Sequence, residues 1–328
     1  MKPLALTMGD PAGIGVELAL AAWRQGGDVG APFFLLADPD QVARLDRALG
    51  LSTPLEITTP AKAAAVFGHA LPIVPLAARA NVEPGRPDPA AAPAILESIE
   101  RAVALTLEGA ASAVVTLPIA KKTLYDAGFK HPGHTEFLGE LARRADPAAE
   151  PVMLIWSEAL AVAPVTIHIP LSAVPAALTR ARIEATARIL DRDLRKRFGI
   201  ERPRIAVAGL NPHAGEGGAM GREEIDMIAP AIKALRADGL DIRGPLPADT
   251  MFHAKARATY DVAMTMYHDQ GLIPVKTLAF DEGVNVTLGL PFVRTSPDHG
   301  TAFDIAGQGI ADVSSLMAAL KLAARLAA

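Results

Sequence analysis

Short apolar stretches alternate along the chain with longer segments in which apolar residues recur at helical spacing. Because strands separated by helices usually pair in parallel, this pattern predicts an α/β fold. The predicted strands are residues 4–8, 32–37, 112–117, 151–156, 160–168, 204–210 and 260–267. The predicted helices are residues 14–24, 40–49, 90–108, 135–144, 175–198, 222–237 and 313–327.

The size and charge of the chain limit its functional class. With 328 residues, of which 50% are hydrophobic, the chain is long enough for two medium-sized cores, so we expect two α/β lobes. A net charge of −4 provides no basic excess that would attract nucleic acid. The arginine-rich segment 179–198 also contains acidic residues, which is typical of a solvated helix face.

The chain has no cysteine, so disulfides and thiolate metal ligands are excluded. Any tight metal site must therefore use histidine and carboxylate side chains. The apolar run at the N-terminus is broken by Asp10 too early for a signal peptide, and no window approaches the length of a membrane span. We expect a cytoplasmic protein with no membrane segment.

Three of the eight histidines lie where a predicted apolar strand ends: His168, His213 and His268. The carboxyl ends of parallel strands share one edge of a sheet, so the three imidazoles could converge on one point. Three neutral imidazoles with open positions suit a catalytic divalent metal. The alternative, in which each histidine is only a polar residue that caps a strand, stays open at this point.

Residues 209–218, GLNPHAGEGG, form a glycine-rich segment between a predicted strand and a predicted helix. The glycines from 215 to 221 do not match the G-x-G-x-x-G fingerprint of dinucleotide-binding loops, because Met220 occupies its last position. We therefore reject a nucleotide cradle and predict a loop that turns sharply beside a bound ligand.

Three polar residues at nine-residue spacing lie in apolar surroundings near the C-terminus: Lys276, Asn285 and Arg294. An ammonium, an amide and a guanidinium together suit a phosphate or carboxylate. The alternative is a set of internal ion pairs to nearby acids: Asp281, Glu282 and Asp298.

His134 and Thr135, in the segment HPGHTEF (131–137), are at the start of a predicted helix. A hydroxyl and an imidazole at a helix N-terminus form either an anion site or a simple N-cap. The local sequence favours the N-cap.

Seven motifs together resemble one known family. They are MGDPAGIG, HPGHTEF, TIHIP, GLNPHAGEGG, GPLPADT, MYHDQG and GVNVTLGLPFVRTSPDHGTAFDIAG. In this order, from residue 4 to about 313, they are similar to the 4-hydroxythreonine-4-phosphate dehydrogenases of vitamin B6 biosynthesis. More distantly, GDPAGIG and HGTAFDIAG resemble segments of isopropylmalate and isocitrate dehydrogenases. Val16 replaces a proline that is common in the family, a change with little bearing on function.

The resemblance implies a fold and an assembly. The fold would be two α/β/α lobes with a cleft between them, like isopropylmalate dehydrogenase and without a Rossmann fingerprint. Residues 1–130 and 284–328 would form the cofactor-side lobe, and residues 131–283 the lobe for metal, substrate and dimerisation. The protein would be a homodimer.

The resemblance also implies roles for individual residues. His168, His213 and His268 would hold one divalent metal, with one ligand supplied by the neighbouring subunit. Substrate would be bound by His134, Thr135, Lys276, Asn285 and Arg294, and Asp249 would accept the hydroxyl proton or hold the substrate amine. NAD would lie against His299, Gly300, Thr301, Ala302 and Asp304.

The implied reaction is oxidation of 4-phosphooxy-L-threonine by NAD, followed by loss of CO2 to leave 3-amino-2-oxopropyl phosphate. Zinc, cobalt or nickel suits three imidazoles better than magnesium, which prefers oxygen ligands. NAD is favoured over NADP because no basic pair follows residues 299–307. Alternatives are oxidation of threonate or erythronate 4-phosphate, oxidation of an aromatic cis-diol, and a metal-dependent phosphohydrolase or phospho-ligand binding protein.

Overall fold

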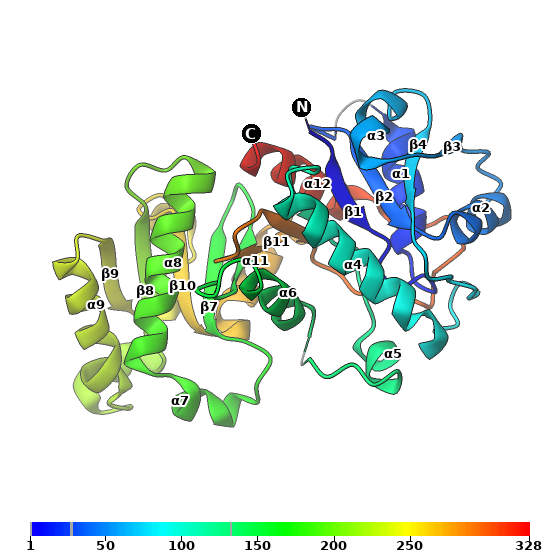
Figure 1. The fold of residues 1–328 in the computed structure, drawn as a ribbon. Helices are drawn as coiled ribbons and strands as arrows, with labels where there is room; N and C mark the ends of the chain where they lie inside the picture. The colour runs from blue at the N-terminus through cyan, green and yellow to red at the C-terminus, as the bar shows by residue number, and fades with distance from the viewer. Residues whose placement is uncertain (1, 27–28, 132) are drawn as a thin grey trace. The chain divides into compact units, whose positions relative to one another are not determined.

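The computed structural model describes residues 2–26, 29–131 and 133–328 and divides into two compact units (Figure 1). One unit comprises Met1–Pro151 and Leu290–Ala328, and the other comprises Val152–Gly289. These limits differ from the boundaries predicted from the sequence, since residues 133–151 lie in the first unit and residues 284–289 lie in the second.

The first unit is built on a parallel sheet with the strand order β3-β4-β2-β1-β5-β12. The strands are β1 (Leu4–Thr7), β2 (Phe33–Ala37), β3 (Leu55–Ile57), β4 (Leu71–Pro75), β5 (Val114–Val115) and β12 (Arg294–Pro297). The apolar sequence FFLLA of β2 is buried at every position, as expected for a parallel strand covered on both faces.

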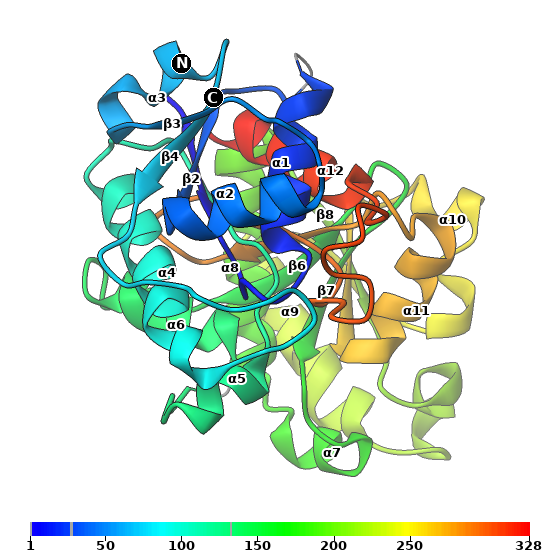
Figure 2. The ribbon, with the colours of Figure 1, turned by 90° about the vertical axis from the view of Figure 1, so that its right-hand side faces the viewer.

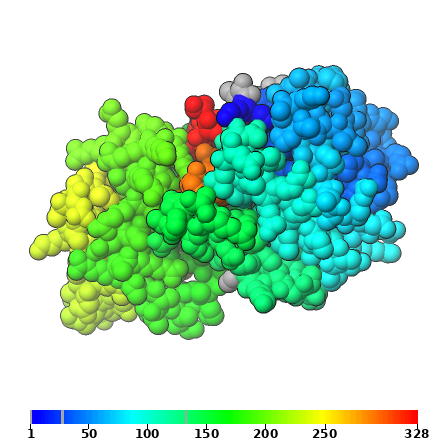
Figure 3. Space-filling view, in the orientation of Figure 1, coloured from blue at the N-terminus to red at the C-terminus, as the bar shows by residue number. Residues whose placement is uncertain are grey.

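Helices cover both faces of this sheet, so the unit has three α/β/α layers (Figure 2). One face carries α1 (Gly15–Gln25), α2 (Pro39–Ala48) and α12 (Ser314–Leu326), and the other carries α3 (Pro60–Val66) and α4 (Ala92–Leu107). In the space-filling view, the cyan residues of the α4 region form part of the surface of this unit that faces the viewer (Figure 3). The remaining helices of the unit are η1 (Pro89–Ala91), α5 (Lys121–Asp126) and α6 (His134–Arg143).

The second unit has a mixed sheet with the strand order β11-β6-β7-β10-β8-β9. Strand β6 pairs antiparallel with both neighbours, whereas β7, β10, β8 and β9 run parallel. The strands are β6 (Val152–Trp156), β7 (Ala161–Thr166), β8 (Arg204–Ala208), β9 (Asp241–Leu246), β10 (Val262–Tyr267) and β11 (Val284–Leu288).

This sheet is also covered on both faces. Helices α8 (Arg180–Phe198) and α9 (Ala229–Ala237) pack together on one face, and α11 (His268–Leu278) packs on β7 and β10 from the other. The short elements are η2 (Leu171–Ala173), α7 (Val174–Ala177), η3 (Pro212–Gly218), η4 (Glu224–Ile228), η5 (Ala248–Thr250) and α10 (Ala254–Arg257). The predicted α/β/α architecture is thus confirmed for each unit.

Two predicted helices are interrupted. The helix predicted over 175–198 is two helices. Leu178 has an extended backbone and ends the first, and Thr179 caps the second by accepting a hydrogen bond from the Arg182 amide at 3.2 Å. The helix predicted over 222–237 begins with a π-helical turn over Glu224–Ile228 before α9. None of the helices in the described part of the chain is long and apolar enough to cross a bilayer.

Helix α11 was not predicted, because Gly271 and Pro274 both disfavour a helix interior. Tertiary packing provides the reason for the glycine. A Cβ atom at position 271 would lie 2.8 Å from Oγ1 of Thr265 and 3.3 Å from Cβ of Val162, so only glycine lets α11 approach the sheet this closely.

Candidate active site

The three predicted metal ligands follow neighbouring strands of the second unit. Strands β7, β10 and β8 are adjacent and parallel, so their carboxyl ends lie at one edge of the sheet. His168 follows β7 by two residues, His268 follows β10 directly, and His213 lies five residues beyond β8. The prediction that each histidine directly ends its strand was therefore correct only for His268.

The imidazoles of His168 and His268 lie side by side. Their ring centroids are 5.5 Å apart, with 44° between the ring planes. Both rings line a pocket of about 210 Å³ whose walls include the apolar side chains of Ile169 and Leu171. Nδ1 of His268 is 2.7 Å from a carboxylate oxygen of Asp269, so Nε2 is the ring nitrogen that this residue can offer to a cation.

His213 lies in a left-handed turn of backbone. The five residues from His213 to Gly217 all have positive φ angles between 44° and 79°. A left-handed conformation costs roughly 1–2 kcal/mol for each residue other than glycine, and the turn contains three such residues: His213, Ala214 and Glu216. Backbone strain of this kind persists where the surrounding structure enforces it, which is common at ligand sites.

A buried carboxylate enforces the turn. Glu224 is 3% exposed, and its oxygens accept hydrogen bonds from the backbone and side-chain amides of Asn211 at 2.8 and 3.0 Å. A Cβ atom at Gly215 would lie 2.6 Å from Oε2 of Glu224, so only glycine fits at this position. Because the loop encloses an acid of its own chain, it is unsuited to cradle a phosphate. This geometry agrees with rejection of the nucleotide cradle.

The described residues do not form a complete metal centre in one chain. Among residues 2–26, 29–131 and 133–328, no three histidine, aspartate or glutamate side chains gather closely enough to hold a metal ion. Two imidazoles lie together, and a third is carried by a loop at the same sheet edge. An all-nitrogen donor set suits borderline cations such as Zn(II) or Co(II), so the chemistry of the residues fits the predicted metal.

Asp249 lies in η5, with its side chain exposed. Element η5 packs against η3, the element that contains His213. The structure therefore brings the predicted proton acceptor into the neighbourhood of one predicted metal ligand.

In the first unit, β12 begins with a buried cation. Arg294 is 3% exposed, and its Nε and Nη2 atoms donate hydrogen bonds to Oγ1 of Thr116 at 3.1 and 2.6 Å. Burial lowers the pKa of the guanidinium to about 10, so it remains charged at neutral pH. Thr116 was not predicted to contribute, and no sequence motif indicates it.

His134, the first residue of α6, lies near this guanidinium. Burial and the positive charge of Arg294 hold the pKa of His134 well below its usual range, so the ring is neutral at pH 7. Its Nε2 is shielded from solvent and has no hydrogen-bond partner in the described residues. A neutral imidazole with an unused nitrogen beside a fixed guanidinium is suited to a buried anionic ligand.

The N-cap interpretation of the HPGHTEF segment was wrong. The N-cap of α6 is Gly133, and His134 and Thr135 are the first two residues of the helix. Lys276 and Asn285, the other predicted anion ligands, belong to the second unit. Lys276 is in α11, with Nζ 5.4 Å from the ring centroid of Phe280, and Asn285 lies opposite Ile155 in the β6–β11 pair.

The predicted cofactor loop of the first unit packs against the GDPAGIG segment. The amide of Ile14 donates to the carbonyl oxygen of Thr301 at 3.0 Å, and the amide of Gly307 donates to Oε2 of Glu17 at 2.9 Å. A Cβ atom at Gly13 would lie 2.7 Å from the Thr301 oxygen. The two segments that resemble isopropylmalate dehydrogenase are thus in contact despite lying nearly 300 residues apart.

Residues with an unusual backbone conformation gather in the predicted ligand segments. Six described residues other than glycine have positive φ: Ser52, His168, His213, Ala214, Glu216 and Ala302. All but Ser52 lie in segments predicted to bind metal, substrate or cofactor. His299 resembles His134, because its Nε2 is also buried without a hydrogen-bond partner in the described chain. Both features are typical of ligand sites.

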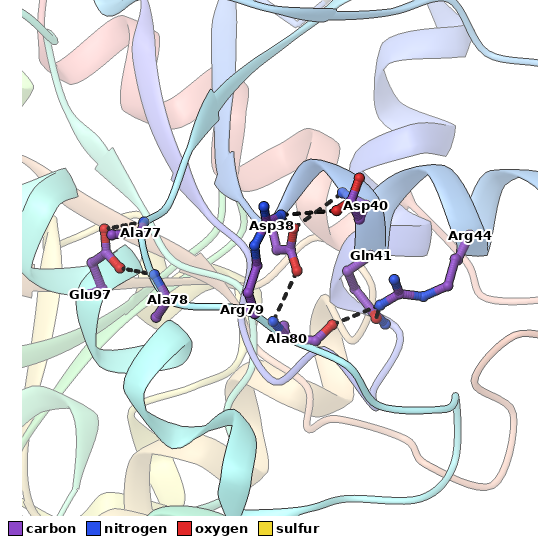
Figure 4. Close-up of polar contacts among 9 residues, drawn as sticks. All are labelled: Asp38, Asp40, Gln41, Arg44, Ala77, Ala78, Arg79, Ala80 and Glu97. Atoms are coloured by element: carbon purple, nitrogen blue, oxygen red, sulfur yellow. Dashed lines mark hydrogen bonds and ion pairs between the residues drawn. The ribbon is translucent and has the colours of Figure 1, made fainter.

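Asp38 occupies the position of the ribose-binding acid in a Rossmann fold, directly after the second strand. Its carboxylate is instead occupied by the amides of Asp40 and Ala80 at 3.1 and 3.0 Å and by Arg79 at 2.9 Å (Figure 4). Burial alone would raise the pKa of Asp38, but the hydrogen bonds from Ala80 and Arg79 outweigh burial and lower it. Any dinucleotide must therefore be recognised differently from a Rossmann ligand.

Comparison with known proteins agrees with the motifs. The model of the family "pyridoxal phosphate biosynthetic protein PdxA" matches residues 30–323. The chain is 62% identical over 331 aligned residues to the 4-hydroxythreonine-4-phosphate dehydrogenase of Methylorubrum populi, covering 99% of this chain and 95% of the relative.

Solved structures agree as well. The crystal structure of 4-hydroxythreonine-4-phosphate dehydrogenase from Klebsiella pneumoniae is similar over 100% of both chains, with a TM-score of 0.88 and 42% identity. A terephthalate 1,2-cis-dihydrodiol dehydrogenase from Burkholderia xenovorans is less similar, with a TM-score of 0.67 and 30% identity over 99% of this chain and 98% of that one. The chain therefore belongs to the pyridoxal phosphate biosynthetic protein PdxA family.

Proposed function

We propose that the chain oxidises the secondary alcohol of 4-phosphooxy-L-threonine in vitamin B6 biosynthesis. The hydride would pass to NAD, and the product, 2-amino-3-oxo-4-phosphooxybutanoate, would lose CO2 to give 3-amino-2-oxopropyl phosphate. The observation that carries the proposal is the pair of imidazoles, His168 and His268, at adjacent strand ends of a chain whose relatives bear this enzyme name.

The proposed metal ligands are His168, His213 and His268, with one of the three coming from the partner subunit. Three imidazoles favour zinc or cobalt over magnesium. When bound, such a cation supplies Lewis-acid chemistry to the reacting oxygen of the substrate. Asp249 would accept the proton of the substrate hydroxyl or hold the substrate amine.

The proposed substrate ligands are His134, Thr135, Lys276, Asn285 and Arg294. Because these contacts are made to groups remote from the reacting carbon, their binding energy would orient the alcohol for hydride transfer. The buried Arg294 and the neutral His134 favour an anionic substrate, whereas a cis-diol without an anionic group would make no use of the buried cation.

The proposed cofactor residues are His299, Gly300, Thr301, Ala302 and Asp304, and NAD bound there would accept the hydride. Packing of this loop against the GDPAGIG segment and the unused Nε2 of His299 support the placement. A phosphohydrolase or a phospho-ligand binding protein would need no such loop.

The test is to follow NADH formation in the near ultraviolet with purified protein. We expect reduction of NAD with 4-phosphooxy-L-threonine, loss of the signal after chelation, and recovery with Zn(II) or Co(II). If NAD were reduced only with threonate 4-phosphate or erythronate 4-phosphate, the substrate would be one of these acids and not 4-phosphooxy-L-threonine. Phosphate release without NADH would favour a hydrolase.

Replacing Thr116 with valine tests how Arg294 is held. Valine keeps the shape but removes the hydroxyl that accepts from Nε and Nη2, so the guanidinium should lose its fixed orientation. We expect the KM for the phosphorylated substrate to rise about tenfold, equivalent to roughly 1.4 kcal/mol for one lost interaction with a charged group, with a smaller effect on kcat. The Thr116→Ser variant should recover the KM. If the valine variant keeps the original KM, Thr116 does not orient Arg294.

The proposed homodimer would use the exposed apolar surface of α11. Ile273 is 65% exposed and Phe280, just after the helix, is 70% exposed, so this region presents two large apolar side chains to water. The same helix begins with His268, so a partner that covers it would approach the proposed metal site. This placement is compatible with a ligand shared between subunits.

Replacing Ile273 with aspartate should shift the protein from dimer to monomer and weaken cation binding, because a charge would be buried in the interface. Light scattering with size-exclusion chromatography measures the assembly. Ile57→Asp is the matched control, since Ile57 is 64% exposed on β3 of the first unit and should leave the dimer intact. A monomeric wild-type protein would contradict the proposed assembly.

A further inference from the structure

One glutamine links two of the strand ends that carry predicted metal ligands. Oε1 of Gln270 accepts a hydrogen bond from the amide of Met266 in β10 at 2.7 Å. Its Nε2 donates to the carbonyl oxygen of Gly209, directly after β8, at 2.7 Å. The primary amide thus uses one acceptor and one donor to connect the ends of two neighbouring strands.

The two linked segments lead to His268 and His213. Met266 lies two residues before His268, and Gly209 lies four residues before His213. The backbone between Gly209 and His213 is further fixed by the contacts of Asn211 with Glu224. Loss of the Gln270 hydrogen bonds would therefore alter the distance between the segments that carry His213 and His268, at the strand ends where these segments begin.

Gln270 is itself held rigidly. It lies in the first turn of α11, next to Gly271, whose close approach to Thr265 and Val162 fixes the depth of the helix on the sheet. The side chain is partly buried, so water competes less for its hydrogen bonds than at the surface.

We propose that Gln270 is a positioning residue for the metal site, which sets the spacing of the segments that carry His213 and His268. The inference rests on the proposed function, because it assumes that these histidines bind a cation. Gln270 touches neither substrate nor cation in this role. It acts through the backbone, as residues behind metal ligands commonly do.

The test is the affinity of the purified dimer for Co(II), measured by titration against a competing chelator, together with the visible absorption of the bound ion. In the Gln270→Met variant, which keeps the length of the side chain but cannot make either hydrogen bond, we expect about 10- to 100-fold weaker binding and an altered spectrum. Gln41→Met is the matched control. Gln41 is 2% exposed and its amide donates to the carbonyl of Val82 in the first unit, so its loss should affect stability without affecting cobalt affinity.

Two outcomes are separable. If the wild-type protein binds no cobalt, the proposed function fails. If the wild-type protein binds cobalt and the folded Gln270→Met variant binds it equally well, only the role of Gln270 is overturned.

Hydrogen exchange of the wild-type protein gives a test that does not depend on the folding of a variant. The amide of Met266 should exchange more slowly when Co(II) is added, because the cation would stabilise the loops that the glutamine bridge joins. Unchanged exchange at Met266 despite bound cobalt would overturn the inference.

Discussion

The His168→Ala and His268→Ala variants should fail to oxidise 4-phosphooxy-L-threonine at concentrations of Zn(II) or Co(II) that saturate the wild-type enzyme. Each change removes one of the two imidazoles whose centroids are 5.5 Å apart. Loss of a direct ligand should weaken cation binding by more than the roughly 10- to 100-fold typical of losing a residue behind a ligand. Equilibrium dialysis with Co(II) and the rate of NADH formation measure the two effects separately.

A surface histidine provides the control for these two variants. His69 lies on the surface of the first unit, where its Nε2 contacts Glu56 at 3.1 Å, and its side chain is 65% exposed. We expect His69→Ala to bind cobalt and form NADH as the wild-type protein does. Full cation binding by either His168→Ala or His268→Ala would remove that residue from the proposed site.

The Arg294→Ala variant should raise the KM for the phosphorylated substrate by about 100-fold or more, equivalent to roughly 3 kcal/mol for a lost charge-assisted contact in a buried site. The KM of the Arg294→Lys variant should lie between those of the wild-type protein and Arg294→Ala. Lysine keeps the charge but lacks the planar guanidinium group that binds two phosphate oxygens. Steady-state kinetics with varied substrate at saturating NAD measure the change.

The control for this pair is another buried arginine. Arg197 in α8 has a side chain that is 8% exposed, with Nε 3.9 Å from the carboxylate of Asp193. Arg197→Lys should leave the KM unchanged. An unaltered KM in Arg294→Ala would contradict the proposal that Arg294 binds the substrate phosphate. If that variant lost only thermal stability, the role of Arg294 would be structural.

The sequence pattern was most informative for long apolar elements. Each of the seven predicted strands contains an observed strand, because burial on both faces leaves an unbroken apolar run. Five strands were not predicted: β3, β4, β9, β11 and β12. Strand β12, with the sequence RTSP, is buried at all four positions although its side chains are mostly polar, so hydrophobicity could not indicate it.

The residues of the candidate site were predicted from motifs and strand ends, but their support was not. Gln270, Thr116 and Glu224 each hold a predicted ligand or its loop through hydrogen bonds to residues distant in the sequence or to the backbone. Spacing and composition carry no signal for such contacts. The left-handed turn at His213 was indicated only by its glycines, since the buried acid that enforces it lies in the following helix.

The central claim is that three imidazoles, spread over 100 residues of chain from His168 to His268, hold one cation beside the substrate. Its most direct test is a crystal structure of the dimer loaded with Co(II), with data collected at the cobalt absorption edge. We predict one anomalous peak per chain, within bonding distance of His168, His213 and His268, with at least one of the three supplied by the partner subunit. A cobalt ion held elsewhere, or these rings remaining apart in the dimer, would contradict it.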